Sequence, residues 1–183
     1  MIYDKDLLDR LSAYAPVGYL NTVYRATRAG LNPLTPSLAG GRWVPKDTTS
    51  VLYTSTAADG ALSEVSFHLS LLNPRPTKPV MLHRIRATTR KTLRLLRADL
   101  IELGVEWHKY ATLEYERCQM IGAAVAFLEC DGLVVPSARW DCESLVIFSN
   151  NHGLDQELEL EHSESVDWIS WATQNGVLPP PIT

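Results

Sequence analysis

The sequence predicts a mixed α+β protein with a single domain, and three observations support this fold class. The chain has 183 residues, a length that one hydrophobic core can serve. Hydrophobic residues make up 45% and charged residues 21%, the proportions of an ordinary globular protein. Short segments of alternating apolar and polar residues are interspersed with segments of helical periodicity, without a repeat or linker between them. We therefore expect one domain over residues 1–183, with at least six short strands and flanking helices.

Four elements are expected in the first part of the chain. They are a short helix after the capping residue Asp4, strands over residues 19–27 and 50–55, and a helix over residues 57–72. Leu7 and Leu11 repeat at helical spacing in the first helix. Thr56 is expected to cap the second helix and Pro74 to stop it. Residues 28–41 contain three glycines and two prolines, which predicts a long loop of the kind that is often functional.

The remaining segments predict five strands and two helices. The strands are expected over residues 79–88, 91–96, 133–139, 144–150 and 157–166, and the helices over residues 112–130 and 166–174. The strands alternate in polarity or form short apolar runs, and Gly132 is expected to follow the end of the long helix. We expect the motif-bearing region to span residues 19–149, with the C-terminal strand and helix in residues 155–176.

Composition argues against several classes of protein. A net charge of −4 and a pI near 5.7 give no overall basic surface, so direct nucleic-acid binding is not expected. The basic run over residues 83–97 is expected to be a solvated strand face. No apolar stretch approaches the ~20 residues that span a bilayer. Cys118, Cys130 and Cys142 form no C-x-x-C pair, and the five histidines lack ligand spacing, so we expect neither disulfides nor a metal site. A cytoplasmic location without a membrane partner is expected.

A cluster of candidate site residues lies between Gly40 and Leu69. Gly41 permits close approach to the main chain, Arg42 offers a planar fork for phosphate or carboxylate, and Trp43 offers a flat surface. Tyr53 lies near a strand end, and Glu64 lies about 110° from the centre of the apolar helix face. Taken alone, these residues also have a purely structural interpretation. Glu64 would then be an exposed helical glutamate, Arg42 an ion-pairing arginine and Tyr53 a core tyrosine. Composition by itself favours that structural interpretation.

Five motif pieces occur in a fixed order along most of the chain. They are Arg25, Gly40-Gly41-Arg42-Trp43, Tyr53-Thr54-Ser55, Ala61-Leu62-Ser63-Glu64 and Pro136-Ser137-Ala138-Arg139. In this order and over residues 24–148 they resemble the RES domain family, which is named for an arginine, a glutamate and a serine. The family often has an asparagine shortly after the last piece. Here Trp140-Asp141-Cys142-Glu143 follows instead, which predicts a bulkier and more acidic rim.

The resemblance implies an ADP-ribosyltransferase-like fold with mixed and antiparallel sheets that binds NAD+ as its substrate. Members of the family act as toxins of bacterial toxin–antitoxin pairs and break the nicotinamide–ribose bond. The ADP-ribose then passes to phosphate, water or a protein, so inorganic phosphate is a possible co-substrate. The resemblance also implies a cognate antitoxin of the Xre type, a helix-turn-helix protein. The alternative is a catalytically weakened NAD+-binding module with a partner-binding role.

The resemblance assigns roles to ten residues. The catalytic set is Glu64, Arg42, Tyr53 and Ser137, and the NAD+-binding set is Tyr24, Arg25, Gly41, Trp43, Thr54 and Arg139. Loss of nicotinamide builds positive charge on the ribose, which a preorganised carboxylate such as Glu64 would stabilise. Arg25 and Arg42 would hold phosphate groups, and Tyr53 would pack against nicotinamide or its ribose. Ser137 would offer its hydroxyl to the substrate.

Two further features lie outside or beside this assignment, the pair Glu114 and Glu116 and the histidine His68. Glu114 and Glu116 form an E-x-E pair, which arginine-modifying ADP-ribosyltransferases use, but they open a long predicted helix. Acidic residues are favoured there by the helix dipole, so the structural explanation is preferred. His68 lies one turn after Glu64 and is expected to be a rim histidine within reach of it.

Overall fold

The computed structural model describes residues 4–153 and 158–178, which contain six strands, five α-helices and one 3-10 helix. The strands are β1 (Val17–Arg28), β2 (Val51–Ser55), β3 (Val80–Arg94), β4 (Gly132–Pro136), β5 (Glu143–Phe148) and β6 (Leu158–Val166). The helices are α1 (Lys5–Ser12), α2 (Ala58–Ser70), α3 (Arg97–Glu102), η1 (Trp107–Lys109), α4 (Glu116–Phe127) and α6 (Trp168–Gln174). The predicted mixed α+β class is confirmed.

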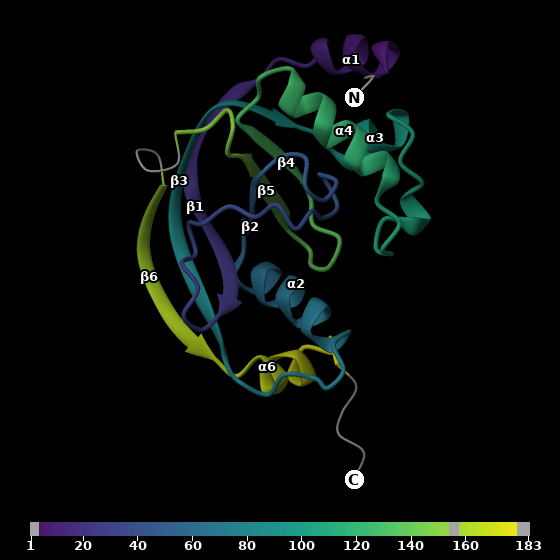
Figure 1. Ribbon diagram of the computed structural model, residues 1–183. Helices are drawn as coiled ribbons and strands as arrows, with labels where there is room; N and C mark the ends of the chain where they lie inside the picture. The colour runs from purple at the N-terminus through teal and green to yellow at the C-terminus, as the bar shows by residue number, and fades with distance from the viewer. Residues whose placement is uncertain (1–3, 154–157, 179–183) are drawn as a thin grey trace.

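The strands form one sheet in the order β1-β2-β5-β4-β3-β6, and β1 also pairs with β3. Only β3 and β4 run parallel to each other. β1 and β2 meet at a single position, Tyr24 opposite Ser55, so the sheet opens between them. Figure 1 shows the long curved strands β1, β3 and β6 along one side and the short strands β2, β5 and β4 in the middle. Helices α1, α3 and α4 gather at one end, and α2 and α6 at the other.

The short strands are apolar on both faces because both faces are covered. Leu145 and Ile147 of β5 pack into a core shared with β1 and β3, whereas Val146 and Phe148 pack toward α1, α3 and α4. Successive side chains of a strand point to opposite faces, so a strand between two cores reads as a continuous apolar run. A third core joins α2 and α6 to the ends of β1 and β3, with Trp168 fully buried in it.

Two predicted strands are one strand in the structure. Residues 79–88 and 91–96 were expected to be separate, yet β3 runs without a break over Val80–Arg94. The carboxylate of Asp131 accepts the backbone N–H groups of Arg90 at 2.6 Å and Lys91 at 2.9 Å. A side chain distant in sequence therefore satisfies the backbone between the two segments that were expected to be separate strands. The arginines at positions 84, 86, 90 and 94 lie on the exposed side of β3, which confirms the predicted solvated basic face.

Other predicted boundaries differ at the helices. The N-cap of α2 is Ala57 rather than Thr56, because the Thr56 hydroxyl instead donates to the carbonyl of Glu143 at 3.1 Å. α4 begins at Glu116 instead of near residue 112, and α3 and η1 were not predicted. The C-terminal strand and helix are present as β6 and α6, while residues 155–157 of that prediction lie outside the described residues. No helix in the described ranges is long and apolar enough to span a membrane.

A buried histidine ties the three long strands together. The ring of His83 on β3 hydrogen-bonds to the hydroxyl of Thr27 on β1 at 2.8 Å and to that of Ser163 on β6 at 2.7 Å. The residue has an exposed fraction of 4%. Burial, and then the nearby charge of Arg25, lower its pKa below the ordinary value of 6.5. The folded protein therefore keeps His83 neutral.

We expect the stability of this fold to decrease as the pH falls below about 6.5, because unfolded His83 gains a proton before the folded one does. The loss should continue until the pH passes the lower folded-state pKa. Urea unfolding between pH 7.5 and pH 5 tests this, with His83→Gln expected to weaken the pH dependence. His162→Gln, at an exposed position of β6, is the control and should leave it unchanged. An equal pH dependence in wild type and His83→Gln would contradict the prediction.

Candidate functional site

A cleft of about 300 Å³ lies where the sheet opens between β1 and β2. Its walls come from β1, β2 and α2, from the loop before β2, from the loop after β4 and from the residue preceding α4. Nine of the ten predicted site residues line it: Tyr24, Arg25, Gly41, Arg42, Trp43, Tyr53, Thr54, Glu64 and Ser137. Residues separated by more than a hundred positions in the sequence thus meet around one cavity.

Close packing at the start of α2 brings this helix over the cleft. A Cβ atom at Gly60 would lie 2.2 Å from Oγ of Ser55 and 2.5 Å from Sγ of Cys142. Only a residue without a side chain allows α2 to approach β2 and the loop before β5 this closely. Glu64 follows one turn later, so its carboxylate lies at the edge of the cleft, as its position on the helical wheel predicts.

Glu64 is a partly exposed carboxylate in a positively charged setting. Its side chain has an exposed fraction of 45%, and its Oε1 lies 3.2 Å from Nε2 of His68. Burial alone raises the pKa of Glu64, but His68, Arg139 and Arg42 together outweigh this effect and lower its pKa. Glu64 is therefore ionised at neutral pH and supplies a negative charge to the cleft.

Arg42 is held in a column of stacked arginine side chains and aromatic rings. Its guanidinium carbon lies 4.9 Å from the ring centroid of Tyr110 and 4.6 Å from that of Tyr115. The Tyr110 ring stacks on Trp107 with centroids 4.4 Å apart, and the guanidinium carbon of Arg97 lies 4.8 Å from the Trp107 ring centroid. Nη2 of Arg42 also donates to the carbonyl of Thr112 at 3.3 Å. The column fixes Arg42, whose exposed fraction is 9%, in the wall of the cleft.

Tyr53 is set against the Gly-Gly turn. Its hydroxyl accepts the backbone N–H of Trp43 at 3.1 Å, and a Cβ atom at Gly41 would lie only 2.8 Å from that hydroxyl oxygen. Burial raises the pKa of Tyr53 to about 12, so the hydroxyl stays protonated. Gly41 is therefore required for close approach of the Tyr53 ring, which extends the close-approach role predicted for this glycine.

Trp43 differs from its predicted role. It was expected to present a flat surface to the substrate, but its exposed fraction is 2% and its ring packs in the core with Ile121 and Phe148. Burying a ring of this size stabilises the fold more than exposing it in a cleft would. Trp43 contributes to the site through its backbone amide, which binds the hydroxyl of Tyr53.

We expect Tyr53→Phe to lower the free energy of unfolding by about 1–2 kcal/mol, because the part-buried N–H of Trp43 loses its acceptor. Chemical denaturation of wild type and variant measures this difference. Tyr14→Phe is the matched control, since the Tyr14 hydroxyl donates to the side chain of Asp99 at 3.1 Å and Tyr14 does not line the cleft. Equal stability of Tyr53→Phe and wild type would contradict a structural role for this hydrogen bond.

The other predicted residues occupy different positions relative to the cavity. Burial lowers the pKa of Arg25 to about 10, which still leaves it charged at neutral pH. The hydroxyl of Ser137 lines the cleft and accepts the N–H of Arg139 at 3.2 Å. Thr54 lines it too, but its hydroxyl donates to the carbonyl of Leu145 at 2.8 Å within the sheet. The Thr54 hydroxyl therefore serves strand pairing.

Arg139 is the one predicted residue that does not line the cleft. Its guanidinium carbon lies 3.4 Å from the ring centroid of Phe67, and Nη1 donates to the carbonyl of Ala111. Burial lowers the pKa of Arg139, while the charge of Glu64 acts in the opposite direction. Arg139 thus places a positive charge near Glu64 without lining the cleft itself.

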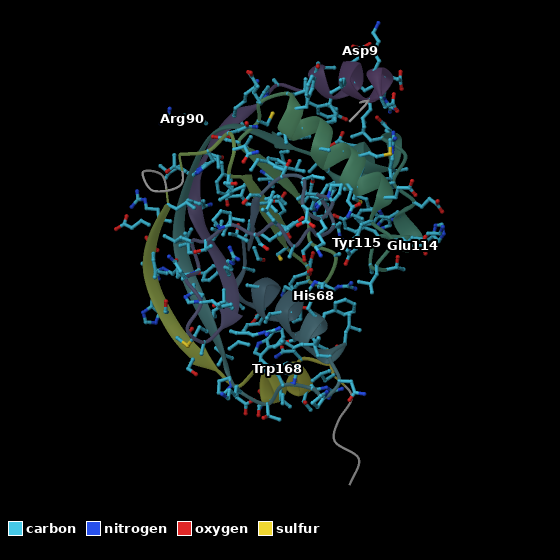
Figure 2. The ribbon with its side chains drawn as sticks, in the orientation of Figure 1. Asp9, His68, Arg90, Glu114, Tyr115 and Trp168 are labelled. Atoms are coloured by element: carbon cyan, nitrogen blue, oxygen red, sulfur yellow. The ribbon has the colours of Figure 1, made fainter. Side chains whose placement is uncertain are left out.

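Tyr115 and His68 line the cleft in addition to the predicted site residues. Tyr115 lines the cleft from the start of α4, and His68 lines it from α2 (Figure 2). His68 was within predicted reach of Glu64, and the 3.2 Å contact confirms this. Tyr115 was missed, because the expected helix over residues 112–130 gave no reason to place one of its aromatic residues in the cleft. No pattern in the local sequence marks it.

The residues of the rival E-x-E motif and of the altered segment 140–143 do not line the cleft. Glu114 is exposed and pairs with Lys109 at 3.3 Å, and neither it nor Glu116 lines the cavity. Glu143 forms two hydrogen bonds to Arg94, at 2.9 and 2.5 Å, and the ring of Trp140 lies 5.7 Å from that of Trp171. The predicted bulky, acidic rim is therefore wrong, because none of Trp140, Asp141 and Glu143 lines the cleft. Among the described residues, no group of three or more His, Cys, Asp and Glu could hold a metal ion.

A helix-borne carboxylate lies beside arginine and tyrosine side chains where the sheet opens, which is the arrangement that the resemblance to the RES domain family implies. Residues 22–169 match the RES domain family, and the chain belongs to it.

The NAD(+) phosphorylase MbcT of Mycobacterium bovis and that of Mycobacterium tuberculosis H37Rv are similar to this chain. Each is 28% identical to it over 143 residues, which cover 74% of this chain and 77% of the relative. The crystal structure of the M. tuberculosis MbcT–MbcA toxin–antitoxin complex contains a chain of the same fold, with a TM-score of 0.78 and 24% identity. That match covers 94% of this chain and 98% of the other.

Proposed function

We propose that this protein is an NAD+-consuming toxin of a bacterial toxin–antitoxin system that acts in the cytoplasm. It cleaves the nicotinamide–ribose bond and transfers ADP-ribose to inorganic phosphate. The observation that carries the proposal is Glu64, an ionised carboxylate at the edge of a cleft whose walls include Arg25 and Arg42. Membership of the RES domain family and similarity to a protein named NAD(+) phosphorylase support it.

The chemistry needs a negative charge close to the reacting ribose. The C1–N bond breaks, its electron pair leaves with neutral nicotinamide, and positive charge develops on the ribose ring. The carboxylate of Glu64 stabilises that charge, and a preorganised group of this kind typically contributes about 3 kcal/mol to lowering a barrier. A phosphate oxygen then forms the new bond to C1. NAD+ and inorganic phosphate are therefore the two substrates of the proposed reaction.

The binding residues divide by their chemistry. Arg25 and Arg42 offer planar donor groups for phosphate oxygens, and the rings of Tyr110 and Tyr115 hold Arg42 in place. Tyr53 provides a ring for nicotinamide or its ribose, while its hydroxyl is held by the backbone. Ser137 offers a hydroxyl in the same cleft, and Tyr24 a second ring. Gly41 contributes by leaving room for Tyr53.

Incubating the purified protein, freed of any bound partner, with NAD+ in the presence and absence of phosphate tests the proposal. Nicotinamide release that requires phosphate, with ADP-ribose 1″-phosphate as the product, is the expected result. Free ADP-ribose would identify water as the acceptor, and a modified polypeptide would identify a protein. Saturable NAD+ binding without cleavage would support the alternative of a catalytically weakened binding module. Absence of both binding and cleavage would overturn the proposal.

We also propose a cognate antitoxin of the helix-turn-helix, Xre type as the protein partner. The related fold was crystallised as a toxin–antitoxin complex, and this supports the proposal for the present chain. A neighbouring reading frame that encodes a small helix-turn-helix protein would supply the candidate. Its product should copurify with this chain and suppress nicotinamide release. A candidate that neither binds nor inhibits would argue against this pairing.

A further inference from the structure

We propose that His68 is a positioning residue that holds the carboxylate of Glu64 in the orientation that the reaction requires. The catalytic consequence rests on the function proposed above, whereas the contact itself does not. Both residues lie on α2, one turn apart, and both line the cleft. Nε2 of His68 lies 3.2 Å from Oε1 of Glu64. Figure 2 shows His68 on α2 and Tyr115, which directly precedes α4 and lines the same cleft.

Glu64 needs such a contact because little else restricts its side chain. Nearly half of the side chain is exposed, and a glutamate has several rotatable bonds that remain mobile unless a partner restrains them. Electrostatic stabilisation of a transition state requires a charge that is oriented before the reaction begins. A hydrogen bond one helical turn away restrains the carboxylate without covering its other oxygen.

The remaining groups around Glu64 act through charge rather than through this hydrogen bond. The cations are Arg42, from the loop before β2, and Arg139, from the loop after β4. The tyrosines that interact electrostatically with Glu64 are Tyr53 on β2 and Tyr110 after η1. Long-range attraction from two arginines keeps the carboxylate ionised but does not select one rotamer. The hydrogen bond from His68 does so.

The imidazole of His68 is itself supported. Its ring meets that of Phe67 edge to face, with centroids 5.4 Å apart, and Phe67 in turn lies under the guanidinium of Arg139. The hydrogen bond between His68 and Glu64 therefore belongs to a small cluster of side chains from α2 and the loop after β4. A surface pair of this spacing contributes little to fold stability, so its removal should affect turnover more than unfolding.

The variants His68→Leu and His68→Gln distinguish a role of His68 in positioning Glu64 from a direct contact of its imidazole with the substrate. The glutamine amide can donate to Glu64 but does not titrate, and leucine cannot donate at all. We expect His68→Leu to lower kcat for nicotinamide release about tenfold, with the KM for NAD+ changed by less than about twofold, as a misoriented group implies. His68→Gln should retain most of the wild-type kcat. His108→Leu, at an exposed histidine outside the cleft, is the control and should change neither constant.

The pH response provides a second readout. Losing His68 removes one of the groups that lower the pKa of Glu64, so the acidic limb of kcat/KM should move to higher pH in His68→Leu. Carbon NMR titration of the glutamate carboxyl groups measures the same change without turnover. Glu64→Gln identifies the Glu64 signal by its absence.

The outcomes are distinct. An unchanged kcat and an unchanged Glu64 titration in His68→Leu would overturn the inference. An equal loss of kcat in His68→Gln and His68→Leu would also overturn it, since it would mean that the imidazole contacts the substrate directly. A wild type that titrates as expected but never cleaves NAD+ would instead refute the proposed function while supporting the contact between His68 and Glu64.

Discussion

Glu64→Gln is expected to reduce nicotinamide release from NAD+ by about 100- to 1,000-fold. The amide keeps the size of the side chain but removes the charge that would stabilise the ribosyl cation, and losses of this order are typical for a preorganised electrostatic group. The free energy of unfolding should change by less than about 1 kcal/mol, because nearly half of the side chain is exposed and its partner His68 is at the surface. Time courses of nicotinamide release and chemical denaturation measure the two effects.

The E-x-E pair provides matched controls for this prediction. Glu114→Gln and Glu116→Gln make the same chemical change at exposed positions just outside the cleft wall. Both variants should retain the wild-type rate. If one of them lost activity while Glu64→Gln kept it, the rival arginine-modifying motif would be the catalytic one. Equal rates in wild type and Glu64→Gln would remove the basis of the proposed mechanism.

Gly122→Ala is expected to cause a large loss of stability, about 3 kcal/mol or more. A Cβ atom at position 122 would lie 1.8 Å from the carbonyl oxygen of Trp43 and 2.8 Å from the carbonyl carbon. Backbone cannot rotate away as a side-chain tip can, so α4 and the Gly-Gly turn must separate. In a protein of this size the loss corresponds to a decrease in melting temperature of about 6–12 °C. Thermal and urea unfolding measure it.

The same substitution should also impair NAD+ cleavage, because Trp43 follows Gly41 and Arg42 directly and its amide binds Tyr53. Gly18→Ala is the control for a glycine substitution elsewhere in the chain. The nearest heavy atom to a Cβ atom there is 3.7 Å away, an ordinary contact, so this variant should stay within about 0.5 kcal/mol of wild type. A stable and active Gly122→Ala protein would contradict the prediction, because α4 and the Gly-Gly turn would then separate without loss of stability.

Local patterns predicted several elements correctly because short-range physics decides them. Asp4 caps α1 as expected, its Oδ1 accepting the N–H groups of Asp6 at 3.0 Å and Leu7 at 3.3 Å. Leu7 and Leu11 are both buried, as their spacing predicts. The apolar runs over residues 133–139 and 144–150 predicted strands, and these are present as β4 and β5. The motif order also placed nine of the ten candidate residues around one cavity.

Long-range contacts account for the errors. The carboxylate of Asp131 binds the backbone of β3 at the point where two separate strands were expected. The hydroxyl of Thr56, which was expected to cap α2, donates instead to the carbonyl of Glu143. The ring of Trp43 lies in the core because α4 and β5 provide a pocket for it. None of these partners is near in sequence to the residue that it affects. Periodicity and propensity describe a segment by itself, so they cannot identify such partners.

The sequence by itself determined the fold class, the order of most elements and the identity of the charged and aromatic groups available to a site. These depend on residue type and on spacing within one segment. The tertiary structure alone decided which of those groups share a cavity and which contacts hold them there. It holds Arg42 between two tyrosines and tethers Glu64 to His68. At Gly122 it reverses the effect of alanine, which intrinsic helix propensity would favour by about 1 kcal/mol. Packing between distant segments is what sets these outcomes, because a contact across the core exists only once the chain has folded.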